Sequence, residues 1–290
     1  MKMLKHISFL CLILFGLNVY GQNYTGKAYG FYQEKSYDSA AVYIDKAVIA
    51  AQEKYNSKTW QLRGVIYRNL EATGGISKRE IAIQSFVTAR KVDTIGQFTE
   101  EIANYLYNIN VRYYNDAVGY LQQGELEKSE SSYLTYKGNY QSILKIEHDF
   151  KKQDIEFYSV LGGAWFKKNS QVEVSEKAKV YQNAILAFQK ALDLDSLNYS
   201  ANYGIGISYY NQGADLITNM NPFEADLDEI DRIQNLSIEM FKKGEPYLKR
   251  AFTINPNEKE VVEGLTGIYY SLNEDDEYNY FRNLLEKMEE

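Results

Sequence analysis

The sequence predicts an all-α protein built from successive helical hairpins. The 290-residue chain contains only three prolines, and runs that alternate apolar and polar residues, as strands do, are hard to find. Apolar residues recur instead at spacings of three and four, which places them on one face of an α-helix. Two short patterns of small and aromatic residues also return several times along the chain, which indicates an internal repeat.

Residues 1–21 have the features of a secretory signal peptide. Two lysines precede an apolar run from Ile7 to Val19, and Val19 and Gly21 supply small side chains at the positions that a signal peptidase inspects. We therefore expect the mature chain to start at Gln22 and to be exported, either to the periplasm or out of the cell. The run is shorter than the roughly 20 apolar residues that span a bilayer, and no later segment qualifies. Retention as an N-terminal anchor is the alternative.

Cleavage at this position leaves 30 basic and 39 acidic residues, a net charge of −9. Such an acidic chain is not expected to bind nucleic acid, because phosphate binding requires a basic face. Cleavage also removes Cys11 and His6, which leaves His148 as the one histidine. We therefore predict no disulfide, no His/Cys metal site and no cofactor. The mature residues suffice for one elongated domain, 22–290, or for two halves, 22–110 and 111–290.

Each predicted hairpin combines small and bulky residues at fixed spacings. The second helix has a small residue, a bulky one four positions later and a third residue, usually small, three after that: Ala40-Ile44-Ala47, Ala82-Phe86-Ala89, Ser129-Tyr133-Tyr136, Ala184-Phe188-Ala191 and Gly244-Leu248-Ala251. The first helix has a small residue followed three later by an aromatic one in most units. Small residues let two helices pack closely while the bulky side chain fills the groove beside them. A non-repeating helical bundle is the alternative.

These positions resemble the tetratricopeptide repeat, a helix-turn-helix unit of about 34 residues. The resemblance is carried by Tyr158, Leu161, Gly162, Trp165, Ala184, Phe188 and Ala191, and a second time by Trp60, Gly64, Tyr67, Ala82, Phe86 and Ala89. It covers nearly all of 22–290 as five full units and a terminal part-unit, and it implies a right-handed α-solenoid. In three units the spacing between the two small residues is longer than in the family.

The segment between the second and third units predicts one long helix. Apolar residues at steps of three and four run from Ile95 to Tyr120, and the pattern ends near Gly124. A helix of about 25 residues would join an N-terminal and a C-terminal half. A break near Asn110 into two helices is the alternative.

The largest insertion follows Gly213 and predicts an extended helical hairpin near the C-terminus. Residues 221–224, Asn-Pro-Phe-Glu, are typical of a helix start, so we expect the second arm to begin there. Pro246 is expected to kink or restart this helix. The apolar stripe of the arms predicts contact with another subunit or another protein, which deletion of residues 214–243 should abolish without unfolding the repeats. Residues 261–290 are interpreted as capping helices.

No arrangement typical of an enzyme stands out. Gly74-Gly75 lacks the following lysine and hydroxyl residue of a phosphate-binding loop, so we interpret it as a turn. His148 is expected in a loop, without a second histidine that could share a metal ion or a proton. The remaining acidic groups are interpreted as a helix end and solvated helix surface, without the alternating signature of a calcium loop: Asp193 and Asp195, 226–231 and 274–277.

The resemblance implies that the first helices line a concave, ligand-binding face. Its ligand-facing positions correspond here to Gln61, Val65, Arg68, Ser159, Gly163, Phe166, Tyr203, Ile207 and Tyr210. This surface mixes aromatic rings with a few polar groups, as peptide-binding grooves do. The alternative is that these tyrosines only pack between neighbouring units.

The function expected from the sequence is therefore an exported, non-enzymatic scaffold that binds a protein or peptide partner in the cell envelope. The exposed tyrosines favour a second hypothesis, a carrier of a small molecule or glycan. A hydrolase that uses a pair of carboxylates is the third hypothesis, because a chain with this many acidic residues brings some pair together by numbers alone.

Overall fold

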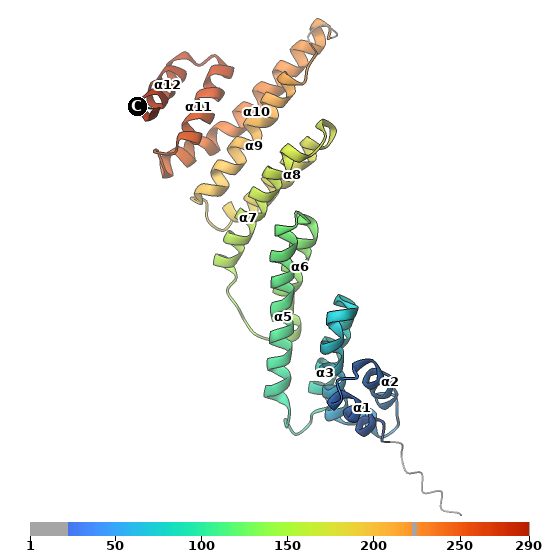
Figure 1. Ribbon diagram of the computed structural model, residues 1–290. Coiled ribbons are helices and arrows are strands. Elements are labelled where there is room, and N and C mark those ends of the chain that lie inside the picture. The colour runs from blue at the N-terminus through green and yellow to red at the C-terminus, as the bar shows by residue number, and fades with distance from the viewer. Residues whose placement is uncertain (1–22, 222–224, 290) are drawn as a thin grey trace, which may run out of the picture. The chain divides into compact units, whose positions relative to one another are not determined.

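The computed structural model describes residues 23–221 and 225–289 (Figure 1). The predicted signal peptide, with Cys11 and the expected mature start at Gln22, lies outside these residues. All regular elements within the described ranges are helices. The chain divides into two compact units, with the boundary between Ile109 and Asn110.

The N-terminal unit consists of two helical hairpins and the first half of a long helix. Its elements are α1 (Tyr24–Gln33), α2 (Tyr37–Ala47), the short 3-10 helix η1 (Glu53–Tyr55), α3 (Ser57–Gly74), α4 (Ile76–Val92) and the start of α5 (Thr99–Gln122). Helix α1 packs on α2, and α3 packs on α4. The hairpins stack, because α3 contacts both α2 and α1. All six repeat residues of α2 and α4 are fully buried: Ala40, Ile44, Ala47, Ala82, Phe86 and Ala89.

The C-terminal unit continues the same arrangement. Its elements after α5 are α6 (Leu126–Asn139), the π-helical turn η2 (Tyr140–Leu144), α7 (Lys151–Lys168), η3 (Asn169–Gln171), α8 (Val174–Leu192), α9 (Tyr199–Thr218), α10 (Leu227–Ile254), α11 (Lys259–Leu272) and α12 (Asp275–Glu289). Hairpins form between α7 and α8, α9 and α10, and α11 and α12. Each successive first helix also contacts the next, α7 with α9 and α9 with α11. Each unit thus consists of stacked helical hairpins, as the sequence predicts.

Phe188 of α8 shows why small residues recur at these positions. A Cβ atom added to Gly162 of α7 would lie 2.6 Å from its ring, and one added to Gly204 of α9 would lie 2.3 Å away. Both distances are far shorter than a carbon–carbon contact allows, so the ring occupies space that two glycines leave open. One aromatic ring therefore joins the two helices of its own hairpin to the first helix of the next.

The prediction of one long helix between the second and third units is confirmed by α5. The alternative, a break near Asn110, is wrong. Asn110 lies within the helix, where it is 2% exposed. Its amide nitrogen donates to the carbonyl of Tyr136 at 3.0 Å, and its amide oxygen accepts from Asn139 at 2.8 Å. The helix begins at Thr99 rather than at Ile95, because the intervening Gly96 has a φ of +70°, which is incompatible with helical continuation.

The second arm of the extended hairpin begins later than the sequence predicts. Ala225 and Asp226 are not helical, and α10 starts at Leu227, where the carboxylate of Asp226 accepts a hydrogen bond from the backbone N–H of Glu229. Aspartate is as good an N-cap as asparagine, so the cap nearer the apolar stripe prevails over Asn221. Pro222, Phe223 and Glu224 lie outside the described residues. Helix α10 continues through Pro246 to Ile254, so the helix does not restart there, whereas a kink at Pro246 stays a prediction.

The extra residues between the repeat positions lengthen helices rather than loops. Helices α3 and α4 are joined by Gly75 alone, whose φ of +64° makes the turn. Helices α9 and α10 lie side by side (Figure 1), and Phe241 of α10 fills the space next to Gly213 of α9. Phe241 is 2% exposed and belongs to the C-terminal core. Deletion of residues 214–243 would therefore remove a core residue together with the tip of the hairpin.

The N-terminus of α1 is capped by a carboxylate from outside the helix. Glu53 accepts hydrogen bonds from the backbone N–H groups of Tyr24 at 3.0 Å and Thr25 at 2.7 Å, and from the Thr25 hydroxyl. We expect Glu53→Gln to lower the free energy of unfolding by about 1–2 kcal/mol, because it removes the negative charge at the helix N-terminus and replaces one of the two accepting oxygens with an amide group that donates. Urea unfolding followed by circular dichroism measures this loss. The exposed Glu34→Gln serves as the control, and an equal effect of both substitutions would contradict the assignment.

Candidate binding sites

The first-helix face of the N-terminal unit contains a cavity of about 470 Å³. Residues of α1, α3 and the first half of α5 line it, together with residues of the α2–α3 connection: Asn23, Thr25, Gly26, Tyr29, Tyr32, Glu53, Asn56, Lys58, Thr59, Gln61, Leu62, Val65, Glu101 and Tyr105. Two of the predicted ligand-facing residues, Gln61 and Val65, are in this set. Three tyrosine rings and several amide and carboxylate groups give the cavity both aromatic and polar walls.

Several polar and aromatic groups of this cavity already interact with other parts of the protein. Glu53 is engaged as the cap of α1, so its oxygens already accept three hydrogen bonds. Burial, followed by the nearby charge of Glu101, raises the pKa of the Tyr105 hydroxyl. Arg68, a predicted site residue outside the cavity lining, places its guanidinium 5.5 Å from the centre of the Tyr105 ring. Tyr105 in turn stacks on Phe86 of the core at 4.8 Å, which fixes one wall.

The predicted residues of α7 lie on the corresponding face of the C-terminal unit. Ser159 is half-buried, and its hydroxyl lies 3.5 Å from the side-chain oxygen of Asn198, the N-cap of α9. Phe166 is also half-buried, with its ring 6.4 Å from that of Tyr181 of α8. Gly163 between them is exposed. These residues therefore adjoin helix–helix contacts and are only partly accessible.

The predicted residues of α9 pack against the last hairpins. Tyr203 and Tyr210 are both half-buried against the C-terminal core. Tyr203 stacks with Tyr199 at 6.2 Å with the rings nearly parallel. The Tyr210 ring lies 5.7 Å from that of Phe241 and occupies the space that Gly267 of α11 leaves open. Ile207 lies near Gly264, which also belongs to α11. This is the arrangement that the packing alternative describes.

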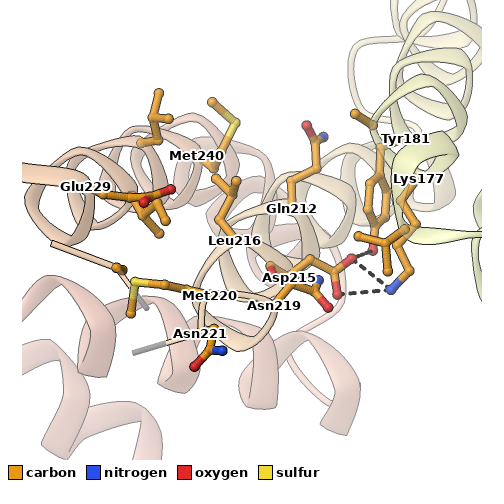
Figure 2. A pocket seen from close by; sticks show the side chains of 15 residues that line it. Lys177, Tyr181, Gln212, Asp215, Leu216, Asn219, Met220, Asn221, Glu229 and Met240 are labelled. Carbon is orange, nitrogen blue, oxygen red and sulfur yellow. Dashed lines mark hydrogen bonds and ion pairs between the residues drawn. The ribbon is translucent and has the colours of Figure 1, made fainter. Parts of the chain in front are cut away.

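A larger groove, which the sequence did not reveal as a site, lies between α8, α9 and α10 (Figure 2). Its volume is about 620 Å³, and it is lined by Val174, Lys177, Ala178, Tyr181, Gln212, Asp215, Leu216, Asn219, Met220, Asn221, Ala225, Glu229, Ile233, Leu236 and Met240. The signal in the sequence was the apolar stripe of the extended hairpin. That stripe could not identify the contribution of α8, which comes from the preceding repeat.

One wall of this groove holds a closed polar network. The Lys177 ammonium pairs with the Asp215 carboxylate at 3.2 Å, and the Tyr181 hydroxyl donates to the same carboxylate at 3.0 Å (Figure 2). The amide nitrogen of Asn169 donates to the Tyr181 hydroxyl at 2.6 Å. Burial and then the Asp215 charge raise the pKa of Tyr181 well above its ordinary value. The network joins α8 to α9, and the Asp215 carboxylate neutralises the charge of Lys177.

The other candidate residues from the sequence, His148, Asp193 and Asp195, make contacts with neighbouring side chains or backbone groups. His148 lies in the connection before α7, with its ring 4.8 Å from Tyr140 and 4.5 Å from Phe150. Asp193 accepts a hydrogen bond from Gln189, and Asp195 accepts one from the backbone N–H of Leu197. In the described part of the chain, no group of three or more histidine, cysteine or acidic side chains is placed to hold a metal ion. Within those ranges, none of the helices combines the length and apolarity that crossing a bilayer requires.

Comparisons with known proteins give distant structural matches. No family model and no curated protein matches the chain. A solved structure from a functional characterisation of Pseudomonas aeruginosa pilF aligns over 91% of this chain and 90% of that chain, with 12% identity and a TM-score of 0.37. A structure of the APC/C hetero-tetramer Cut9-Hcn1 aligns over 84% of this chain and 42% of that chain, with 14% identity and a TM-score of 0.33. Neither similarity bears on function.

Proposed function

We propose that this protein is an exported, non-enzymatic scaffold that binds a protein or peptide segment in the cell envelope through the face of its first helices. Export rests on the predicted signal peptide. The observation that carries the binding proposal is the 470 Å³ cavity on the first helices of the N-terminal unit, where Gln61 and Val65 lie beside three tyrosine rings. Partly exposed tyrosines next to amide groups supply contact area and hydrogen bonds, as protein-binding surfaces do.

The cavity carboxylates support a binding role over acid–base chemistry. Of the two that line it, Glu53 is occupied by the N-terminus of α1, and Glu101 is exposed. The Glu53 oxygens therefore hold α1 in place rather than facing a bound molecule. The scaffold proposal needs neither group to react.

Affinity capture tests this proposal. The tagged protein, expressed in its native host and crosslinked in cells, should recover a defined partner. Tyr29→Ala should reduce that recovery by about tenfold, because exposed aromatic residues contribute a large share of binding energy. Tyr29 lines the cavity and is 50% exposed, so its removal should leave the fold intact. Tyr55 of the same unit is 69% exposed and lies outside the cavity, which makes Tyr55→Ala the matched control. Capture of no partner by the folded bait, or equal loss in both variants, would contradict the proposal.

The same cavity favours a second candidate, a glycan carrier. Tyr29 and Tyr32 present neighbouring rings 6.5 Å apart, and Asn56, Gln61 and Glu101 offer planar polar groups to hydroxyls. A sugar that binds the folded state would raise the melting temperature, by an amount that corresponds to about 2.7 kcal/mol at 100 times its dissociation constant. A shift that Tyr29→Ala abolishes and Tyr55→Ala retains would select this candidate over a protein partner.

A further inference from the structure

The groove between α8, α9 and α10 is lined by three helical faces, each in helical register. Helix α8 contributes positions 174, 177, 178 and 181, α9 contributes 212, 215 and 216, residues 219 and 220 follow just after its end, and α10 contributes 229, 233, 236 and 240. Spacings of three and four mean that each helix presents one continuous face to the groove. At 1.5 Å per residue the faces of α8 and α10 extend over about 10–16 Å, the length of two to three helical turns.

Eight of the fifteen described residues that line the groove are apolar, and several of these are partly open to solvent. Val174 is 57% exposed, and Leu216, Met220, Leu236 and Met240 are each half-buried. Met220 and Met240 are two of the three methionines in the described residues, and methionine adapts its shape to irregular partners. Figure 2 shows both methionines and Leu216 around the opening. Burial of this surface by a partner is favourable, because it removes exposed apolar area from water.

The chain segments that form the α9 and α10 walls of the groove are strongly acidic. From Gly213 to Met240 the described residues include six acidic side chains and one basic side chain. Glu229 lines the groove, and the exposed Asp228 and Asp231 belong to the same first turns of α10. The carbonyl end of α9, which carries partial negative charge, also reaches the groove at Asn219.

These charges discriminate between occupants. Among the described lining residues Lys177 is the one cation, and it is already paired with Asp215. An acyl chain with a carboxylate or phosphate head group would therefore find no free positive charge and would meet the carboxylates of α10. A partner whose apolar side is flanked by lysine or arginine residues meets complementary charge instead.

We infer that this groove binds an amphipathic α-helix of a partner protein, with apolar residues at i, i+3 or i+4, and i+7 and with basic residues facing the start of α10. Such a helix packs as a fourth helix over α9, between α8 and α10, by the same ridges-into-grooves contacts that join the hairpins. The site is separate from the first-helix cavity of the N-terminal unit. The inference therefore stands or falls independently of the proposal above.

Two designed peptides test this inference. Both are 16-residue helices with leucine at positions i, i+3, i+4 and i+7, and the polar positions are lysine in one and glutamate in the other. The purified protein should bind the fluorescent leucine–lysine peptide in an anisotropy titration at least about tenfold more tightly than the leucine–glutamate peptide, and the preference should shrink as salt is raised from about 50 to 500 mM.

Point variants locate this binding. Glu229→Lys should weaken binding of the leucine–lysine peptide about tenfold and strengthen that of the leucine–glutamate peptide. Glu239→Lys is the matched control, because Glu239 lies on the same helix outside the groove, with nearly the same side-chain exposure, 54% against 50%, and a similar ion pair. Leu216→Ser should weaken both peptides about tenfold, whereas Ile217→Ser, at an exposed neighbour that does not line the groove, should not.

The opposite results would overturn the inference. Equal effects of Glu229→Lys and Glu239→Lys would mean that the peptide binds the acidic surface without using the groove. Equal affinity for both peptides would contradict the inference that the partner helix is basic. Sedimentation of the protein alone completes the test: self-association that Leu216→Ser abolishes would show that a second copy of this chain, rather than a partner helix, fills the groove.

Discussion

Replacing Phe188 with alanine is expected to lower the free energy of unfolding by about 3–5 kcal/mol, the largest effect of any single substitution considered. The side chain is 3% exposed, and its ring lies against both Gly162 and Gly204. Its removal leaves a cavity between three helices from two hairpins. Because glycines form two walls of this cavity, no neighbouring side chain there can move to fill it.

Urea unfolding followed by circular dichroism measures this loss. Leu186→Ala is the control, because Leu186 lies on the same helix and is 51% exposed, and we expect it to cost under about 1 kcal/mol. If both substitutions cost the same, Phe188 does not hold the hairpins together.

The converse substitution should also destabilise the protein. Gly204→Ala places a methyl group 2.3 Å from the Phe188 ring, and overpacking of this kind costs about 1–3 kcal/mol. Phe188→Leu in the Gly204→Ala background should recover part of the loss, because the smaller side chain makes room for the methyl group. A double-mutant cycle measures this coupling, and strict additivity would contradict the contact.

The protein is expected to lose stability steeply as the pH rises above about 10. Burial raises the pKa of Tyr67, Tyr158 and Tyr269 to about 12, and it raises that of Tyr133 further still. In the unfolded chain these hydroxyls lose their protons near pH 10. Between the two values the folded state binds more protons than the unfolded state, so the free energy of unfolding falls as pH rises. The stabilisation is complete below pH 10 and is lost as the pH passes through the raised values.

Tyr269 isolates one contribution to this alkaline loss. It is fully buried, and its hydroxyl donates to the Glu245 carboxylate at 3.0 Å. A shift of two pKa units corresponds to at most about 2.7 kcal/mol, so Tyr269→Phe should reduce the loss between pH 9 and 12 by about 2 kcal/mol. Unfolding midpoints at several pH values, with tyrosinate absorbance at each, measure it. Tyr270→Phe is the adjacent control, since Tyr270 is 69% exposed. Unchanged pH dependence in Tyr269→Phe would contradict the effect of burial.

The sequence predicts part of the candidate sites because only part of each site is local. Gln61 and Val65 fall on one face of one helix, so their position in the repeat placed them on the first-helix face. The groove over α9 combines residues from Val174 to Met240 on three helices. Periodicity within each helix identified its apolar face, but which faces meet depends on how successive hairpins stack.

The sequence by itself determined the all-helical class, the hairpin repeat and the buried small and bulky positions, because helical periodicity and side-chain volume act within a turn or two of chain. Only the tertiary structure decided that Phe188 fits against Gly204 of the following hairpin, that α10 starts at Leu227 and that the groove stays open. These features depend on contacts between helices, whose energies outweigh the local preferences at any single residue.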